Sequence, residues 1–317
     1  LAILYHFGRL EYWHLTMVSL ANGAAWALDW PTRRALLPDL VGRDHVVDAM
    51  VLENVLQSLT RLSGPLLAGL AMQHLGAGGT LWILCLIGGT GLLVLLGLRT
   101  DSHSPEQTAG IRDALARTRE GLRYVRGNSA ILGTLIITVI MNAWAFPFQA
   151  LLPVFARDVL GQGPFGLGLL GAANGAGAMV GLLLVNLSRR SFGHPAIFST
   201  GSILACVGLL AFSLSSSMTL SLAALAIAGV GQAGFSIMQS SIILVEATDQ
   251  MRSRAMGALV IAIGVGPLGR VQAGAMAAAW SAPVAVFCMA ASGALATLAV
   301  VLLLLGFVRR SQEPPDD

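Results

Sequence analysis

Four long stretches of this 317-residue chain contain no charged residue, namely 127–156, 159–188, 191–245 and 271–308. A helix that crosses the hydrocarbon core of a bilayer needs about 20 consecutive, mostly apolar residues, so each stretch can hold one or two such helices. The chain is 11% charged, whereas a soluble domain carries about 25% charged residues. The sequence therefore predicts an all-α polytopic membrane protein, and it excludes a soluble enzyme and a secreted disulfide scaffold.

Breaks at charges, prolines and glycine clusters divide the chain into nine predicted membrane-spanning helices. These spans are 14–36, 47–73, 77–98, 130–152, 165–188, 195–214, 218–243, 254–279 and 283–307. Most connections are only a few residues long, which predicts antiparallel helical hairpins. The apolar residues 1–8 are too few to cross a bilayer, and the first residue is not Met. We therefore expect the sequence to be N-terminally truncated and to begin within a helix.

Residues 99–129 form a long polar connection that holds ten of the 35 charged residues. Four of its apolar residues recur at helical spacing, Ile111, Leu115, Leu122 and Val125. This pattern suggests an amphipathic helix at the membrane surface, and the interpretation that we favour is a solvated linker with one surface helix. We divide the chain into an N-terminal transmembrane half (1–98), a cytoplasmic linker (99–129) and a C-terminal transmembrane half (130–317).

The arginines predict the orientation, because cytoplasmic loops of membrane proteins carry an excess of basic residues. All 19 basic residues are arginines. If the linker is cytoplasmic, fifteen of them lie on the cytoplasmic side and only Arg9 and Arg157 lie opposite, while Arg61 and Arg270 lie within spans. We expect a multi-pass protein of a bacterial cell (inner) membrane with a cytoplasmic C-terminus.

Two Gly-Pro pairs interrupt the apolar pattern, Gly64-Pro65 in span 47–73 and Gly266-Pro267 in span 254–279. Such a pair loosens a helix and lets a neighbour approach closely. Many transporters consist of two six-helix halves joined by a cytoplasmic loop. If two and a half helices are missing from the front, the two pairs lie in the fifth and eleventh helices, at equivalent positions of the repeat.

Several segments resemble the major facilitator superfamily, and within it bacterial exporters similar to the enterobactin exporter and macrolide efflux proteins. The matching segments are 31–41 (PTRRALLPDLV), 61–69 (RLSGPLLAG), 121–125 (GLRYV) and 151–158 (LLPVFARD). The resemblance covers the chain as part of helix three through helix twelve, and it implies a major facilitator fold whose first half is incomplete here. Segment 61–69 is similar to the superfamily's antiporter motif, which implies export. Segment 186–193 is a degenerate copy of the superfamily's loop motif, and the arginine expected on helix four, before Asn22, is missing.

The resemblance also implies that helices one, four, seven and ten line a central cavity. The three of these that are present each carry polar or aromatic residues three, four or seven positions apart, which places them on one helical face. The stripes are Asn22, Trp26, Asp29 and Arg33; Asn142, Phe146 and Gln149; and Gln232, Phe235 or Ser236, Gln239 and Glu246. We predict that they line the substrate path. The alternative is that the amides hold neighbouring helices together.

Helix five carries Glu53, Gln57 and Arg61 in one sector beside the Gly-Pro pair. The predicted coupling and gating residues are Asp29, Glu53, Gln57, Arg61, Gly64, Pro65, Gly69, Gly266, Pro267 and Arg270. A structural polar interface between the halves is the alternative. Protons are the expected coupling ion, because a chain without lysine has no ATP-binding P-loop. The candidate acids are Asp29 and Glu53, with Glu246 behind them.

Other chemistry is not indicated. Cys85, Cys206 and Cys288 are far apart and show no metal-ligand spacing, and we expect no cofactor. The net charge of only +3 gives no basic surface for nucleic acid, and no Ser/His/Asp set predicts an enzyme. We therefore expect a secondary active transporter in the lipid bilayer that exports a hydrophobic or amphipathic small molecule, such as a drug or siderophore. An importer of the same fold, and a non-transporting truncated remnant or partner subunit, remain as alternatives.

Overall fold

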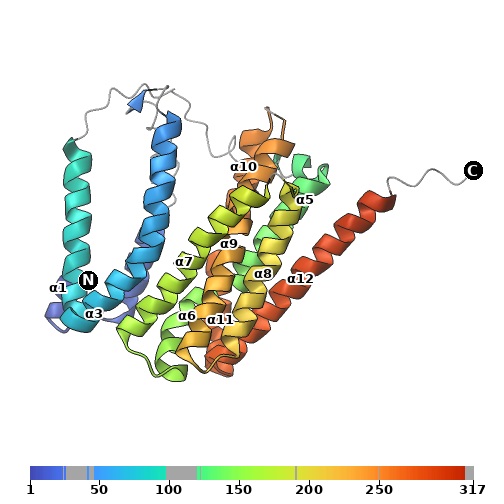
Figure 1. Cartoon of the computed structure of the whole chain (residues 1–317). Helices are drawn as coiled ribbons and strands as arrows, with labels where there is room; N and C mark the ends of the chain where they lie inside the picture. The colour runs from blue at the N-terminus through green and yellow to red at the C-terminus, as the bar shows by residue number, and fades with distance from the viewer. Residues whose placement is uncertain are drawn as a thin grey trace, which may run out of the picture. The chain divides into compact units, whose positions relative to one another are not determined.

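A computed structural model describes residues 1–23, 25, 41–42, 46–97, 120–121, 123–189, 191–248 and 250–310. The chain divides into two compact units, which are residues 1–107 and 108–317 (Figure 1). Each unit is described by itself. All regular structure in the described residues is helical, and the predicted all-α polytopic class is confirmed.

Seven helices among the described residues are long and apolar enough to cross a membrane. Two facts account for the difference from the nine predicted spans. The helix α3 (Val46–Gly97) covers two of the predicted spans. At Gly76 the backbone φ is 68°, which is not helical, so α3 consists of two helices joined by a kink at the predicted break. The first predicted span, 14–36, is helical over residues 12–23 and lies mostly outside the described residues beyond that point.

The first unit begins with the short helix α1 (Ala2–His6). This helix packs against α3, where a Cβ built on Gly78 would lie 3.0 Å from Cε1 of Tyr5. The α3 helix continues through Pro65 without a break.

The second unit contains the remaining helices in chain order. They are α5 (Ser129–Ile140), η2 (Met141–Ala145), α6 (Phe148–Val154), η3 (Phe155–Val159), α7 (Pro164–Ser188), α8 (His194–Ser213), α9 (Met218–Glu246), α10 (Arg252–Ile263), α11 (Gly266–Ala279) and α12 (Ala282–Arg310). The side chain of Asn128 caps α5 by accepting hydrogen bonds from the amides of Ala130 (3.0 Å) and Ile131 (3.1 Å). The starts of α7, α8 and α11 carry Pro in the first turn, where its missing N–H costs no helical hydrogen bond.

Helix α9 lies between α7 and α8 (Figure 1), and glycines set the close approach. A Cβ on Gly177 would lie 1.9 Å from the carbonyl oxygen of Ala226, and one on Gly229 would lie 2.1 Å from that of Asn174. On the α8 side, a Cβ on Gly231 would lie 2.3 Å from the amide nitrogen of Ala205. Small residues that let backbones touch are typical of membrane helix packing.

Aromatic side chains fill the centre of this unit. Phe155, Phe198 and Phe212 are fully buried, and the rings of Phe155 and Phe212 lie 4.2 Å apart between centroids. Because these residues come from η3 and α8, they join the first and third spans of the unit.

The end of the linker packs against the helices of the second unit. Val125 is 2% exposed and belongs to a core cluster that includes Ile131, Ile243 and Leu259. The hydroxyl of Tyr124 accepts a hydrogen bond from the amide of Thr248 at 3.2 Å. Glu120 forms an ion pair with Arg254. The other three residues of the predicted amphipathic pattern, Ile111, Leu115 and Leu122, lie outside the described residues.

Candidate functional site

The first span of the second unit is interrupted in its middle. Regular α-helix gives way to a π-helical turn over Met141–Ala145, in which the amide of Phe146 donates to the carbonyl of Met141 at 2.9 Å. Pro147 follows and has no N–H, so the carbonyl of Ala143 lacks its usual i+4 donor. Single π-helical turns inside α-helices occur frequently at functional sites.

A second interruption lies at the predicted Gly266-Pro267 pair. Helix α10 ends at Ile263, the backbone turns through Gly264 and Val265, and α11 begins at Gly266. Pro267 provides no amide donor for the carbonyl of Ile263. This span is therefore two short helices rather than one.

The two interruptions pack directly against each other. A Cβ on Gly269 would lie 2.7 Å from the carbonyl oxygens of both Asn142 and Ala143, and 2.6 Å from Cγ of Pro147. A Cβ on Gly266 would lie 3.6 Å from Oδ1 of Asn142. We name this region, formed by Asn142, Ala143, Pro147, Gly266 and Gly269, the interrupted-helix junction. Discontinuous membrane helices with freed backbone groups form many transporter binding sites.

A short chain of hydrogen bonds lies beside the junction. Nε2 of Gln239 donates to Oγ1 of Thr138 at 2.8 Å, and that hydroxyl donates to the carbonyl of Thr134 at 2.7 Å. Nδ2 of Asn142 donates to the carbonyl of Thr138 at 2.9 Å. Gln239 is 6% exposed, so in this structure its amide ties α9 to α5. Thr138 is a polar partner that the spacing argument missed, although it lies one turn before Asn142.

Two predicted aromatic residues meet at the same level of the unit. The rings of Phe146 and Phe235 are 5.1 Å apart in an edge-on arrangement, and Phe235 also stacks on Phe198 at 5.3 Å. Phe235 is buried and Phe146 is half-buried. The structure thus brings together Asn142, Phe146, Phe235 and Gln239 from two predicted stripes.

The other predicted residues of this unit are not part of that group of contacts. Gln149 and Ser236 are exposed, Gln232 is half-buried, and Glu246 is exposed at the end of α9. Arg270 is exposed on α11. Among the described residues it forms no hydrogen bond or ion pair, unlike Arg254.

The predicted residues of the first unit are only partly described. Trp26, Asp29 and Arg33 lie outside the described residues, and Asn22 is exposed. On α3, Glu53, Gly64 and Pro65 are half-buried, Gln57 and Arg61 are exposed, and Gly69 is buried. The hydrogen bonds and ion pairs of the described residues include none that joins Glu53, Gln57 and Arg61 to one another. The gating network on this helix stays a prediction.

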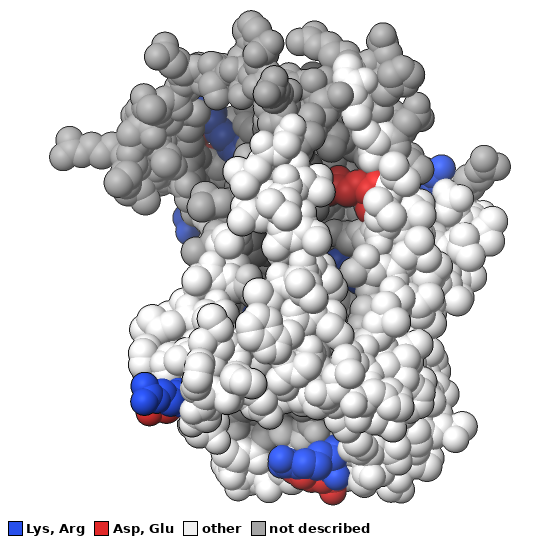
Figure 2. Space-filling model, turned by 90° about the vertical axis from the view of Figure 1, so that its left-hand side faces the viewer, with Lys and Arg blue, Asp and Glu red and all other residues white. Residues whose placement is uncertain are grey.

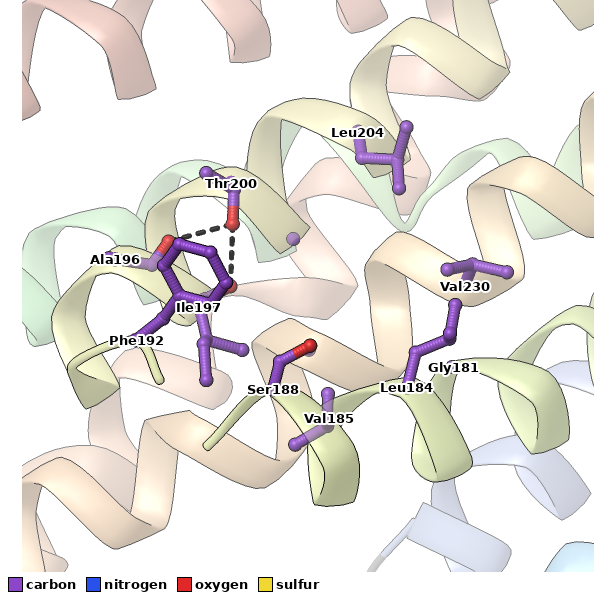
Figure 3. A pocket seen from close by; sticks show the side chains of 12 residues that line it. Gly181, Leu184, Val185, Ser188, Phe192, Ala196, Ile197, Thr200, Leu204 and Val230 are labelled. Carbon is purple, nitrogen blue, oxygen red and sulfur yellow. Dashed lines mark hydrogen bonds between the residues drawn. The ribbon is translucent and has the colours of Figure 1, made fainter. Parts of the chain in front are cut away.

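A cleft of about 320 Å3 opens elsewhere on the second unit, between α7, α8 and α9 (Figure 3). Its lining is mostly apolar: Gly181, Leu184, Val185, Ser188, Phe192, Ala196, Ile197, Thr200, Gly201, Leu204, Val230 and Gly234. The hydroxyl of Thr200 donates within its own helix, to the carbonyls of Ala196 (2.7 Å) and Ile197 (3.3 Å). The lining contains none of the predicted cavity residues.

Charge is sparse on the part of the surface that the described residues form (Figure 2). Figure 2 shows one face on which white atoms separate a few blue and red patches. Arg157 and Asp158 form one exposed ion pair at 2.6 Å. In the part of the chain that the structure describes, no three His, Cys, Asp or Glu side chains gather as a metal site.

Comparison with known proteins agrees with this architecture. Residues 1–315 match the family model described as transmembrane secretion effector. YvqJ, an uncharacterized MFS-type transporter of Bacillus subtilis (strain 168), is 27% identical over 207 residues, which cover 63% of this chain and 49% of the relative. The chain thus spans about half the length of that relative, and no solved structure matches it. The chain belongs to the transmembrane secretion effector family, a family of major facilitator transporters and therefore of multi-pass membrane proteins rather than enzymes.

Proposed function

We propose that this protein is a secondary active exporter that moves a hydrophobic or amphipathic small molecule across a bacterial cell membrane by alternating access. The observation that carries the proposal is the interrupted-helix junction, where a π-helical turn and a broken helix pack on each other beside Asn142 and Phe146. The family description, which names secretion, supports the outward direction.

The junction combines the two features that an amphipathic substrate requires. Asn142 is half-buried and provides a polar amide, and the half-buried ring of Phe146 provides an apolar surface. Ligand sites in proteins are mostly apolar with a few well-placed polar groups. Within the second unit, Gln149 and Gln232 extend the proposed path, and Phe235 and Gln239 contact Phe146 and Thr138. For the first unit, Asn22 and Trp26 stay predictions from the sequence.

Proton coupling is proposed through acids of the first unit. The spans of the second unit hold no acidic residue between 159 and 245 or between 271 and 308. Asp29 and Glu53 are the coupling candidates, with Gln57 and Arg61 as gating partners on the same helix as Glu53. The arginine distribution supports a cytoplasmic C-terminus.

An accumulation assay tests this proposal. The chain is expressed in cells that lack their main efflux pumps, and the uptake of ethidium, Nile red and 8-anilinonaphthalene sulfonate is measured with and without an uncoupler. We expect at least one dye to accumulate several-fold less than in control cells, and the uncoupler to abolish the difference.

The variant Asn142→Leu should lose this effect, whereas Arg157→Gln, on the exposed ion pair, should keep it. Unchanged accumulation of every dye would contradict transport and favour the inactive remnant. Higher accumulation that the uncoupler abolishes would indicate import instead.

A further inference from the structure

The apolar cleft between α7, α8 and α9 lies within the second unit, and its lining includes no residue of the interrupted-helix junction (Figure 3). Its α7 residues, from Gly181 to Ser188, and its α8 residues, from Ala196 to Leu204, recur about one helical turn apart, so each set lies on one face of its helix. These faces run for about 10–12 Å. The volume of about 320 Å3 matches the smaller ligand sites of proteins, which begin at about 300 Å3, whereas a helix is about 10 Å across. The cleft therefore admits a slender apolar group rather than another helix.

The chain makes a tight turn at one end of the cleft. The carbonyl of Ser188, the last residue of α7, accepts hydrogen bonds from the amides of Ser191 (3.0 Å) and Phe192 (2.9 Å). Ser188 and Phe192 both line the cleft. Arg189 lies between them in this turn and is exposed, and its Cα is about 3.8 Å from that of Ser188. A positive charge thus lies at the end of the apolar cleft.

The charge near this turn is positive only. No acidic residue occurs between positions 159 and 245, and the basic residues in this range are Arg189 and Arg190. Glu246, at the end of α9, lies 12 positions after Gly234, the last cleft residue of that helix, which corresponds to about 18 Å along the helix. The other described acids of this unit are paired with arginines of their own. Within the described residues, the turn therefore presents a net positive charge beside an apolar surface.

We propose that this cleft binds one acyl chain of an anionic phospholipid, whose headgroup phosphate pairs with Arg189. The lipid offers a slender apolar chain followed by a negative charge, in the order in which the cleft and the turn follow each other. A guanidinium binds phosphate bidentately. The arginine distribution places this turn on the cytoplasmic side that we propose, where membrane leaflets carry anionic lipids and basic pockets between helices bind their headgroups. The inference does not depend on the transported molecule.

A pair of lipids with identical chains tests the headgroup. Lipid retention by the purified whole protein is measured by native mass spectrometry from micelles that contain equal amounts of dioleoylphosphatidylglycerol and dioleoylphosphatidylcholine. We expect one phosphatidylglycerol per chain to be retained, at least fivefold more than phosphatidylcholine. Arg189→Gln should reduce this preference at least threefold, and Arg189→Lys should keep most of it. Arg157→Gln, on the exposed ion pair, should leave it unchanged.

A second pair of variants tests the cleft. Ala196 and Ala211 are both exposed alanines of α8, and of the two only Ala196 lines the cleft. Ala196→Phe should therefore reduce the retention of phosphatidylglycerol several-fold, whereas Ala211→Phe should not. Because both positions and Arg189 are exposed, we expect every variant to fold, which unliganded melting curves verify. The Arg189 variants decide the question by themselves if Ala196→Phe does not fold.

Four results would overturn the proposal. The first is equal retention of the two lipids, and the second is a headgroup preference that Arg189→Gln does not change. The third is equal loss of lipid in Ala196→Phe and Ala211→Phe, or displacement of the lipid by glycerol phosphate at similar concentration, either of which would show that the cleft contributes nothing. The fourth is no retained lipid together with a lower melting temperature for Ala196→Phe alone, which would indicate that protein fills the cleft.

Discussion

The two Gly-Pro pairs look equivalent in the sequence but differ in structure. At Gly64-Pro65 the helix α3 continues, and among the described residues a Cβ on Gly64 would come within 4 Å of Cγ2 of Thr60 alone, at 3.9 Å. At Gly266-Pro267 the helix is broken, and Gly269 packs directly on the backbone of the π-helical turn. A Gly-Pro pair thus permits a break but does not impose one, and the pair that is broken is the one that packs against a neighbouring interruption.

The largest expected difference concerns the glycines themselves. Gly269→Ala places a methyl group within 2.7 Å of two carbonyl oxygens, and overpacking of this kind costs about 1–3 kcal/mol. We expect a clear drop in the melting temperature of the detergent-solubilised protein. Gly64→Ala is the matched control and should change it little. An equal drop in melting temperature for Gly269→Ala and Gly64→Ala would contradict the difference in packing between the two Gly-Pro pairs.

The two prolines should differ in their effect on the transport rate, with little effect on stability. Pro267→Ala restores an N–H where the helix is broken, which allows α10 and α11 to join. We expect transport to slow about tenfold, since interrupted helices form the proposed working site, with folding preserved. Pro65→Ala adds a donor to a helix that is already continuous and should affect transport less. Dye efflux rates of the two variants measure this difference, and a larger loss for Pro65→Ala would reverse the assignment.

The smallest expected effect is the stability that the hydrogen bond between Gln239 and Thr138 contributes beside the broken Gly-Pro pair. In the described part of α3, no such bond to another helix lies beside Gly64-Pro65. Interhelical hydrogen bonds in membrane proteins contribute about 0.6 kcal/mol on average. A double-mutant cycle with Gln239→Leu and Thr138→Val should give a coupling energy of this size. A coupling energy of zero would show that this hydrogen bond does not stabilise the interrupted-helix junction.

The sequence predicted the helical class and the turn at Gly76, because charge-free stretches and glycine punctuation are local signals. It also selected Asn142, Phe146, Phe235 and Gln239, since a spacing of three and four residues fixes the helical face. It did not predict the π-helical turn at Met141, against whose backbone Gly269 packs from a segment far away in the sequence. It likewise missed the glycine contacts around α9, where Gly177, Gly229 and Gly231 looked like ordinary small residues until their neighbours were known.

The most direct test of the central claim is the accessibility of the junction from the two sides of the membrane. Asn142→Cys is placed in a background with Cys85, Cys206 and Cys288 replaced, and a membrane-impermeant thiol reagent is applied to intact cells and to inverted vesicles. Arg157→Cys is the control and should react from one side only. Alternating access predicts that Asn142→Cys reacts from both sides and that an uncoupler changes the ratio. Reaction from a single side under every condition, or from neither, would contradict the account.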